Sequence, residues 1–224
     1  MGLGDARVRH VVGDIADPAQ VRARVGRDTG VVVHLAARVH VMRDSVADPL
    51  EAFRRANVVA TDRLAQACVR AGVRRFVFAS SIKVNGESTE GTRCFDERSE
   101  PAPQDPYGVS KLEAEQLLRS YAARGLHVTV LRPPLMYGPG VKGNMLSLIR
   151  ALERGVPLPL GGVRNTRSLL GVRNFADAVA TVLAQTRAAG GGGTGRGSIR
   201  MGTVRVKIEP LPSSLSTPIS PPSS

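Results

Sequence analysis

The sequence predicts an α/β protein built on a doubly wound parallel sheet of the Rossmann-like type. Apolar runs at 31–37, 74–80 and 126–132 have the length of strands, and their largely continuous hydrophobic character is typical of strands buried on both faces of a parallel sheet. Segments with helical periodicity separate and follow these runs. Strands that alternate with helices favour a doubly wound sheet.

Each element has a local signal. RVRHVV at 7–12 predicts a short strand, and an Asp-Pro start predicts a helix over 17–25. The segment 48–72 predicts a long helix that stops at Gly72. The remaining expected helices begin at Tyr107 and span 144–155 and 174–186.

Composition limits the class of protein. At 224 residues, 42% of them apolar, the chain can form one large domain, or one domain and part of a second. Aromatic residues make up 4% and Trp is absent, so we expect an aliphatic core. No run approaches the roughly 18 apolar residues of a membrane span, and no signal-peptide pattern follows Met1. Cys68 and Cys94 form no framework or metal spacing, which favours a reducing cytoplasm.

The net charge of +12 comes from 27 arginines and four lysines against 19 acidic residues. These basic residues are scattered along the expected helices without interleaved aromatic residues, which argues against a specific nucleic-acid partner. An anionic small ligand such as a nucleotide diphosphate would use the same charge.

The last part of the chain differs in composition. From Ala188 it contains a glycine run and then an excess of Pro and Ser, with little apolar periodicity. This composition predicts a disordered tail over 188–224. Two origins stay open for it, a flexible linker to a partner or the translation product of a shifted reading frame.

The strongest chemical signal is Tyr107 four residues before Lys111 at the start of a predicted helix. Residues at i and i+4 project from the same side of a helix, so an ammonium there is expected to lower the pKa of the phenol towards neutrality. FASSIKVNGE at 78–87 also delivers Ser81 to the carboxyl edge of the sheet, where ligands bind in such folds. Together they predict a proton-transfer site.

The ordered motifs resemble the extended short-chain dehydrogenases/reductases, and more closely the NAD-dependent epimerase/dehydratase family. They are HLAA, NVVAT, SSIKVNG, YGVSK, LRPPLMYGPG and the RSLLGV and NFADA segments. The resemblance covers about residues 7 to 187. It is similar in detail to the branch containing 4-epimerases and 4-keto reductases of UDP-N-acetylhexosamines, which is associated with surface-polysaccharide synthesis.

The resemblance implies roles by position. Ser81, Tyr107 and Lys111 match the catalytic serine, the tyrosine acid/base and the lysine that anchors the cofactor ribose. The other positions that match the NAD or NADP site are Asp14, Ile15, Ala36, Ala37, Arg38, Asn57, Pro133 and Pro134.

The substrate implied by the resemblance is a UDP-sugar, with possible pairing of the protein into a homodimer. Ser81 matches a residue that contacts the sugar, and Asn144 and Arg167 match residues that contact its diphosphate. A helix N-cap and a surface arginine are equally good interpretations of Asn144 and Arg167. Lys83 and Lys142 also carry a charge that would suit a sugar diphosphate.

One family feature is absent from the sequence, the strand and glycine-rich turn that receive the cofactor pyrophosphate. We therefore expect an incomplete sheet that lacks the first βαβ unit, in a fragment that does not bind NAD or NADP detectably. The predicted organisation is a partial NAD(P)-binding domain over 1–187, with substrate-domain elements in about 138–172, followed by the tail.

Two functions follow from these observations. The first is a nucleotide-sugar oxidoreductase or epimerase that transfers a hydride between nicotinamide and C4 of the sugar. The second is a non-catalytic remnant or interaction module of the same family, without cofactor binding. The motifs distinguish neither an epimerase from a reductase nor NAD from NADP.

Overall fold

The computed structural model describes residues 8–39, 48–89, 94–96, 98–141, 143–155, 157 and 167–188. These residues fall into two compact units. The first contains the described residues up to Pro133 together with 186–188, and the second runs from Pro134 to Gln185. None of the described helices is both long enough and apolar enough to cross a membrane.

The first unit is built on a parallel sheet with the strand order β1-β2-β3. Its strands are β1 (Val32–His34), β2 (Arg75–Ala79) and β3 (His127–Leu131). Their register aligns Val33 with Val77 and Val77 with Thr129. The apolar runs of the sequence therefore predicted these strands correctly, although β1 is shorter than its run.

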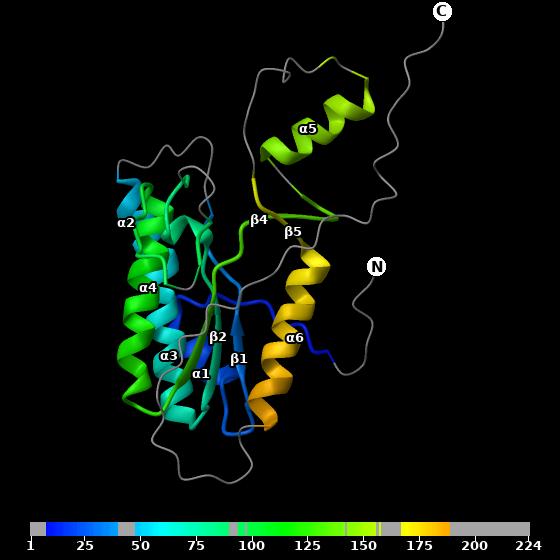
Figure 1. The fold of residues 1–224 in the computed structure, drawn as a ribbon. Helices are drawn as coiled ribbons and strands as arrows, with labels where there is room; N and C mark the ends of the chain where they lie inside the picture. The colour runs from blue at the N-terminus through cyan, green and yellow to red at the C-terminus, as the bar shows by residue number, and fades with distance from the viewer. Residues whose placement is uncertain are drawn as a thin grey trace, which may run out of the picture. The chain divides into compact units, whose positions relative to one another are not determined.

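Three helices pack against this sheet, α1 (Pro18–Arg24), α3 (Ala60–Ala71) and α4 (Pro106–Ala122), as Figure 1 shows. The aromatic side chains of β2 that face them, Phe76 and Phe78, are each 1% exposed. The core that they form with the helices also contains Val21, Leu64, Ala65, Ala67, Cys68, Val73, Ala114, Leu118, Tyr121, Leu126 and Val130. Apart from those rings, it is mostly aliphatic, as the composition predicted.

Three helices of the first unit, those that begin at Pro18, Pro49 and Pro106, start in the same way. Asp17, Asp48 and Asp105 each stand before a proline, and each accepts a hydrogen bond from a backbone N–H of the first turn. Aspartate is a favoured N-cap, and proline fits the first helical position because that residue needs no N–H donor. At its other end, α3 stops at Gly72, which adopts φ +76°.

The predicted helix over 48–72 forms, but it is not uniform. Between α2 (Pro49–Phe53) and α3, the six residues Arg54–Val59 form a π-helical segment, η1. Asn57, inside this segment, is 1% exposed. Short π segments within helices are frequent at functional sites.

The strand predicted at 7–12 is wrong for the described residues 8–12, which form no strand. Val12 is 97% exposed there. Among the described residues, β1 pairs only with β2, so no neighbouring strand offers a ladder to residues 8–12. A segment with strand propensity stays irregular when no neighbour bonds its backbone groups.

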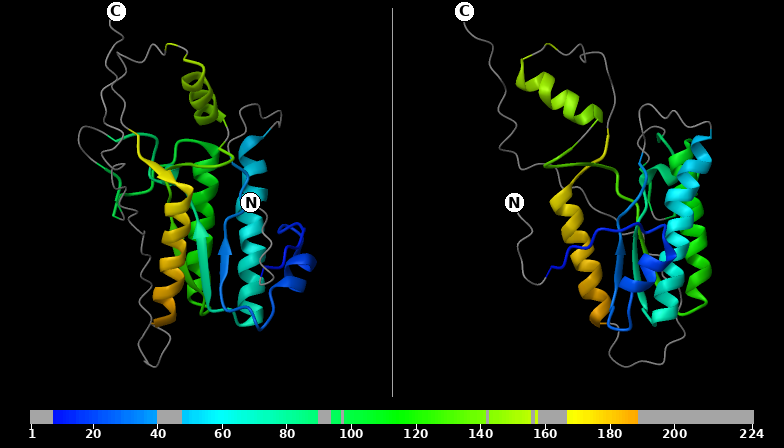
Figure 2. Two further views of the ribbon diagram at one scale, coloured as in Figure 1. Left: turned by 90° about the vertical axis from the view of Figure 1, so that its right-hand side faces the viewer. Right: turned by 180° about the vertical axis from the view of Figure 1, so that it is seen from behind.

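The second unit contains β4 (Leu135–Tyr137), α5 (Gly143–Glu153), β5 (Leu169–Gly171) and α6 (Val172–Ala188). The two strands pair in parallel. Both helices were predicted, whereas the strands were not, because three residues carry too little periodicity to be recognised. Figure 2 shows the ribbon from two further sides. The predicted tail lies outside the described residues except for Ala188, which ends α6.

Candidate active site

The loop that follows β2 carries Ser81. Its side chain caps a short 3₁₀ helix, η2 (Ile82–Val84), by accepting a hydrogen bond from the backbone N–H of Lys83 at 3.3 Å. The N–H of Ile82 donates to the carbonyl oxygen of Pro133 at 3.0 Å, just after β3. Ser81 is thus held at the carboxyl edge of the parallel sheet, where ligands bind in open α/β folds.

Tyr107 lies in the first turn of α4. The turn is fixed by Asp105, whose Oδ1 accepts from the N–H of Gly108 at 2.6 Å. The side chain of Ser81 lies near the hydroxyl of Tyr107 and acts as its hydrogen-bond partner in lowering its pKa, although 26 positions separate the two residues in the sequence. The structure therefore brings together the two hydroxyl groups that the sequence predicted for proton transfer.

The electrostatic prediction for Tyr107 is wrong in direction. Its pKa is raised, chiefly because burial disfavours the charged phenolate. The hydrogen bond from Ser81 and the positive charge of Lys83 lower the pKa, and the negative charge of Asp105 raises it. Lys111 is not among these causes. Because its pKa is raised, Tyr107 is held in its protonated, proton-donating form at neutral pH.

Lys111 lies on the inner side of α4 and is 1% exposed. Its Nζ stands 4.1 Å from the centroid of the Phe78 ring, a cation–π contact. Burial lowers the pKa of this amine to about 8, while the negative charge of Glu115 works to raise it. The i, i+4 spacing correctly predicted that Lys111 lies one turn from Tyr107, but burial in the apolar core sets the pKa of the lysine.

His34 at the end of β1 is buried beside the same lysine. Its Nε2 lies 2.9 Å from Oγ1 of Thr61, which in turn donates to the carbonyl oxygen of Asn57 at 2.5 Å. Burial, followed by the positive charge of Lys111, lowers the pKa of His34 to about 4. The imidazole is therefore neutral in the folded protein at neutral pH.

A pH dependence of stability follows from His34. Between pH 6.5 and 4 the histidine binds a proton in the unfolded chain but not in the folded one. The contribution of His34 to the free energy of unfolding is therefore fully present above pH 6.5 and is lost as the pH falls towards 4. Denaturant titrations should show a loss of about 2 kcal/mol between pH 7 and pH 5. His34→Gln should flatten this slope, whereas His127→Gln, at an exposed site, should leave it unchanged. An equal slope in His34→Gln would contradict the assignment.

Asn57 connects three parts of the site. Its Oδ1 accepts from the N–H of Arg38 at 2.8 Å, and its Nδ2 donates to the carbonyl of Arg38 at 3.1 Å and to Oγ of Ser110 at 2.9 Å. Ser110 in turn donates to the carbonyl oxygen of Tyr107 at 2.8 Å. One amide side chain thus joins the loop after β1 to the helix that carries the tyrosine.

Asn57→Ala should lower the free energy of unfolding by about 1–3 kcal/mol, because buried partners lose their hydrogen bonds. Amide exchange at Arg38 should accelerate at the same time. Gln116→Ala, an exposed change on α4, should stay within about 0.5 kcal/mol of the parent protein. Equal effects of the two substitutions would show that Asn57 does not hold the loop.

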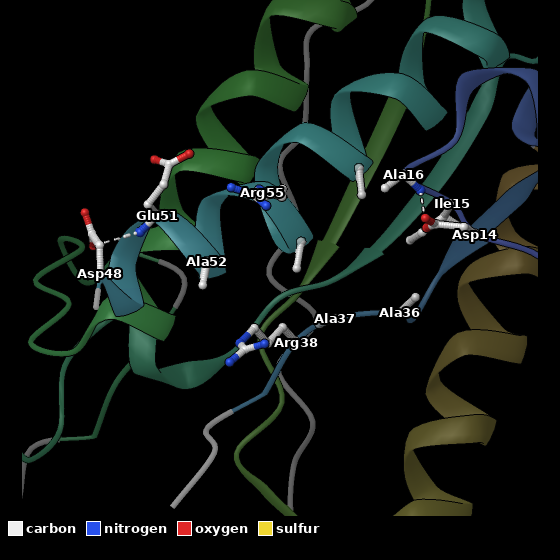
Figure 3. Close-up of a pocket in the computed structure, with 12 residues that line it drawn as sticks. Asp14, Ile15, Ala16, Ala36, Ala37, Arg38, Asp48, Glu51, Ala52 and Arg55 are labelled. Carbon is white, nitrogen blue, oxygen red and sulfur yellow. Dashed lines mark hydrogen bonds between the residues drawn. The ribbon is translucent and has the colours of Figure 1, made fainter. Parts of the chain in front are cut away.

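A hollow of about 680 Å³ opens beside the carboxyl end of β1, as Figure 3 shows. Its lining includes residues that the resemblance assigned to the cofactor, namely Asp14, Ile15, Ala36, Ala37 and Arg38. It also contains residues that sequence reasoning missed, namely Ala16, Asp48, Glu51, Ala52, Arg55, Ala56 and Ala60. Most of the missed residues come from α2 and η1, whose position over β1 could not be inferred from the sequence.

The residues of this hollow fit part of a dinucleotide. Alanines and Ile15 provide apolar walls for a flat ring, Asp14 provides a carboxylate, and Arg38 and Arg55 provide cations for phosphate. Asp14 is ordered by the N–H of Ala16, which donates to its Oδ1 at 2.7 Å. Within the described ranges no glycine-rich turn follows a strand on this side. No cluster of metal-ligating side chains occurs there either.

The other predicted positions lie apart from this group in the chain. Pro133 is buried and bonds the Ser81 loop, and Pro134 is the first residue of the second unit. Asn144 lies in the first turn of α5, and only its backbone is described. Arg167 is exposed, two residues before β5. The cofactor roles of the two prolines and the substrate roles of Asn144 and Arg167 stay predictions.

Lys83 is already paired. Its Nζ bonds to Asp105 at 2.5 Å and to Glu87 at 2.8 Å. Two carboxylates therefore neutralise the charge that would have suited a sugar diphosphate, while Lys142 lies outside the described residues.

A buried ion pair joins α4 to the residue that follows β3, Arg132. Nε and Nη2 of Arg132 donate to the two carboxylate oxygens of Glu115 at 2.9 and 2.5 Å, and Nη1 donates to Oδ1 of Asn85 at 3.2 Å. The side chains of Arg132 and Glu115 are 6% and 0% exposed. Glu115 continues the i, i+4 series from Lys111, which was the one sequence signal for it.

Comparisons with known proteins agree with this geometry. Residues 3–194 match the model of the NAD dependent epimerase/dehydratase family. UDP-glucose 4-epimerase of Vibrio cholerae is 45% identical over 165 residues, which are 73% of this chain and 50% of that protein. The chain spans about half the length of the curated relatives it matches.

Solved structures agree as well. dTDP-glucose 4,6-dehydratase of Streptomyces venezuelae, with NAD bound, gives a TM-score of 0.70 at 33% identity, over 81% of this chain and 56% of that one. UDP-glucuronic acid 4-epimerase of Bacillus cereus, in complex with UDP-glucuronic acid and NAD, gives 0.69 at 26% identity, over 80% and 57%. The Rossmann-like α/β fold predicted from the sequence is confirmed, and the chain belongs to the NAD dependent epimerase/dehydratase family.

Proposed function

We propose that this chain carries the catalytic side of a nucleotide-sugar 4-epimerase or 4-keto reductase. The observation that supports the proposal is that Ser81 lies beside the hydroxyl of Tyr107, with Lys111 one turn further along α4. The bound cofactor would supply the nicotinamide that takes or gives a hydride at C4 of the sugar. Relatives that act on or bind UDP-sugars indicate a UDP-sugar as the substrate class.

The proton chemistry follows from the side chains. Tyr107, whose pKa is raised by burial, is protonated at neutral pH and can give its proton to a C4 carbonyl oxygen as that carbon is reduced. Ser81 can hydrogen-bond the same oxygen. A reductase would use this step once, and an epimerase would use it in both directions, with the 4-keto sugar presenting its other face between them.

Asp14, Ile15, Ala36, Ala37 and Arg38 are the residues that would hold the adenosine side of NAD or NADP. NAD is favoured, because the family is NAD dependent and the similar dTDP-glucose 4,6-dehydratase binds NAD. The nicotinamide side is assigned to Asn57, Lys111, Pro133 and Pro134, and the substrate diphosphate to Asn144 and Arg167. We extend the proposal to a cytoplasmic role in polysaccharide synthesis.

The second candidate, a non-catalytic member of the family, is favoured by one observation. The described residues contain no glycine-rich turn for the pyrophosphate, and that turn supplies much of the affinity for a dinucleotide in this fold. A protein with the catalytic pair but without that turn would keep the fold and lose the cofactor.

One experiment separates the two candidates. The chain is titrated by calorimetry with NAD, NADP and their reduced forms. It is then incubated with each oxidised cofactor and UDP-glucose or UDP-N-acetylglucosamine, and with each reduced cofactor and a 4-keto UDP-sugar, while NMR follows the sugar at C4. Cofactor binding with conversion supports the enzyme. Cofactor binding without conversion of any UDP-sugar or 4-keto UDP-sugar overturns it, and the absence of binding supports the non-catalytic candidate for this chain.

A further inference from the structure

One residue that the proposed chemistry does not use, Lys83, bonds both to Ser81 and to the N-cap of the helix that carries Tyr107. Its backbone N–H donates to Oγ of Ser81 at 3.3 Å. Its Nζ bonds to Oδ2 of Asp105 at 2.5 Å, and the other oxygen of that carboxylate caps the helix of Tyr107 through Gly108. Lys83 therefore connects the serine loop to the tyrosine helix by hydrogen bonds at both ends.

The backbones of these two segments are also in close contact. A Cβ added at Gly108 would lie 2.8 Å from the carbonyl oxygen of Lys83. Contacts this short with a backbone atom do not occur, so only glycine lets η2 approach the first turn of α4 so closely. The close approach and the ion pair act on the same two segments.

Two charged groups act on the phenol in opposite directions. Among the described residues the charged groups that act on Tyr107 are Asp105, from the N-cap of its own helix, and Lys83, from η2. The ring of Phe53 in α2 also packs near the phenol, with its centroid 6.0 Å from that of Tyr107. Lys83 and Asp105 oppose each other, and Glu87 also bonds to the ammonium of Lys83 at 2.8 Å. Removing Lys83 therefore leaves the phenol beside the negative charge of Asp105, and removing Asp105 leaves it beside the positive charge of Lys83.

We propose that Lys83 and Asp105 form a positioning pair, which holds Ser81 against Tyr107 and sets two opposing charges beside the phenol. Their side chains are 34% and 21% exposed, so the pair lies at the edge of the site and not in the core. The inference rests on the proposed function, because it gives the pair a purpose only if Tyr107 transfers protons. Its test does not require turnover.

The test measures the pKa of Tyr107 in the full chain. Tyrosine labelled with ¹³C at Cζ gives one signal for each of the three tyrosines, and Tyr107→Phe identifies the relevant one. Lys83→Met, which keeps the length of the side chain and removes its charge, should raise the pKa of Tyr107. Asp105→Asn, which keeps an equally good N-cap, should lower it.

Two further variants separate position from charge. Lys83→Arg keeps the positive charge and should leave the pKa of Tyr107 close to that of the parent chain. Gly108→Ala changes no charge but pushes η2 away, so it should raise the pKa by weakening the bond from Ser81. Arg70→Met, which removes an arginine bonded within α3, is the matched control and should shift nothing.

Shifts in opposite directions for Lys83→Met and Asp105→Asn support the pairing. Shifts in the same direction, or none in either variant, overturn it, since a merely structural role would disturb both variants alike. If the chain also converts a UDP-sugar, Lys83→Met should lower kcat and leave KM unchanged, because a positioning residue does not bind the substrate. A raised KM with an unshifted pKa would assign Lys83 to the diphosphate and overturn the positioning role.

Discussion

Replacing Arg132 with methionine should lower the free energy of unfolding by about 3–5 kcal/mol, because it leaves the carboxylate of Glu115 buried without its bidentate partner. That carboxylate is fully buried, and water cannot take the place of the guanidinium. The loss is measured by urea denaturation at neutral pH. Asn85 loses its bond to Nη1 in the same variant, so the loop after η2 should exchange its amide protons faster.

Two variants sharpen this prediction. The double change Arg132→Met with Glu115→Leu removes both charges and should recover a large part of the loss, since apolar residues of similar volume often replace a buried ion pair without cost. Arg54→Met breaks the half-exposed pair with Glu113 on the same helix and should cost much less, because solvent screens that pair. Equal losses for Arg132→Met and Arg54→Met would contradict the importance of burial.

Tyr107→Phe should reduce any turnover of a UDP-sugar by about 10²–10⁴-fold, the usual contribution of a positioned general acid. The ring and its contact with Phe53 are kept, so the fold and the binding of the sugar should change little. Conversion is followed by NMR at matched concentrations of folded protein. Because the pKa of Tyr107 is raised, turnover that requires its protonated form should persist through neutral pH and fall only in alkaline solution.

The control for this substitution lies on the same helix. Tyr121 is also a buried phenol of α4, and its hydroxyl bonds to Asp62 and not to the Ser81 loop. Tyr121→Phe should lower stability and leave turnover per folded molecule unchanged. Equal turnover in the two variants would remove Tyr107 from the chemistry.

The sequence revealed elements whose signals are local. The Asp-Pro pair at 17–18 and the glycine at 72 marked helix ends correctly, and continuous apolar runs marked the strands of the first sheet. The strand predicted at 7–12 failed because a strand depends on a neighbour as well as on its own residues. The strands β4 and β5 gave no signal in the sequence, because each has only three residues and is defined by its pairing with the other.

The candidate site shows the same division. Tyr107 and Lys111 share a helix, so their spacing was informative, and ordered motifs identified Ser81. The partners that set their charges were hidden, because Lys83, Asp105 and Glu115 act through side-chain directions that no spacing encodes. The shift in the pKa of Tyr107 was predicted in the wrong direction, because the spacing of residues does not show how deeply the phenol is buried. Burial outweighs the nearby charges.

The π segment over Arg54–Val59 fixes the direction in which the side chains of this helix point toward the site. Each residue of an α-helix turns the chain by about 100°, so adding or removing one residue rotates everything beyond it by that angle. A single deletion within this segment would let the helix run on as a regular α-helix, yet it would turn Asn57 away from Arg38 or Thr61 away from His34. An insertion or deletion in this segment would therefore break the bonds of Asn57 to Arg38 or of Thr61 to His34, while the helix itself would still form.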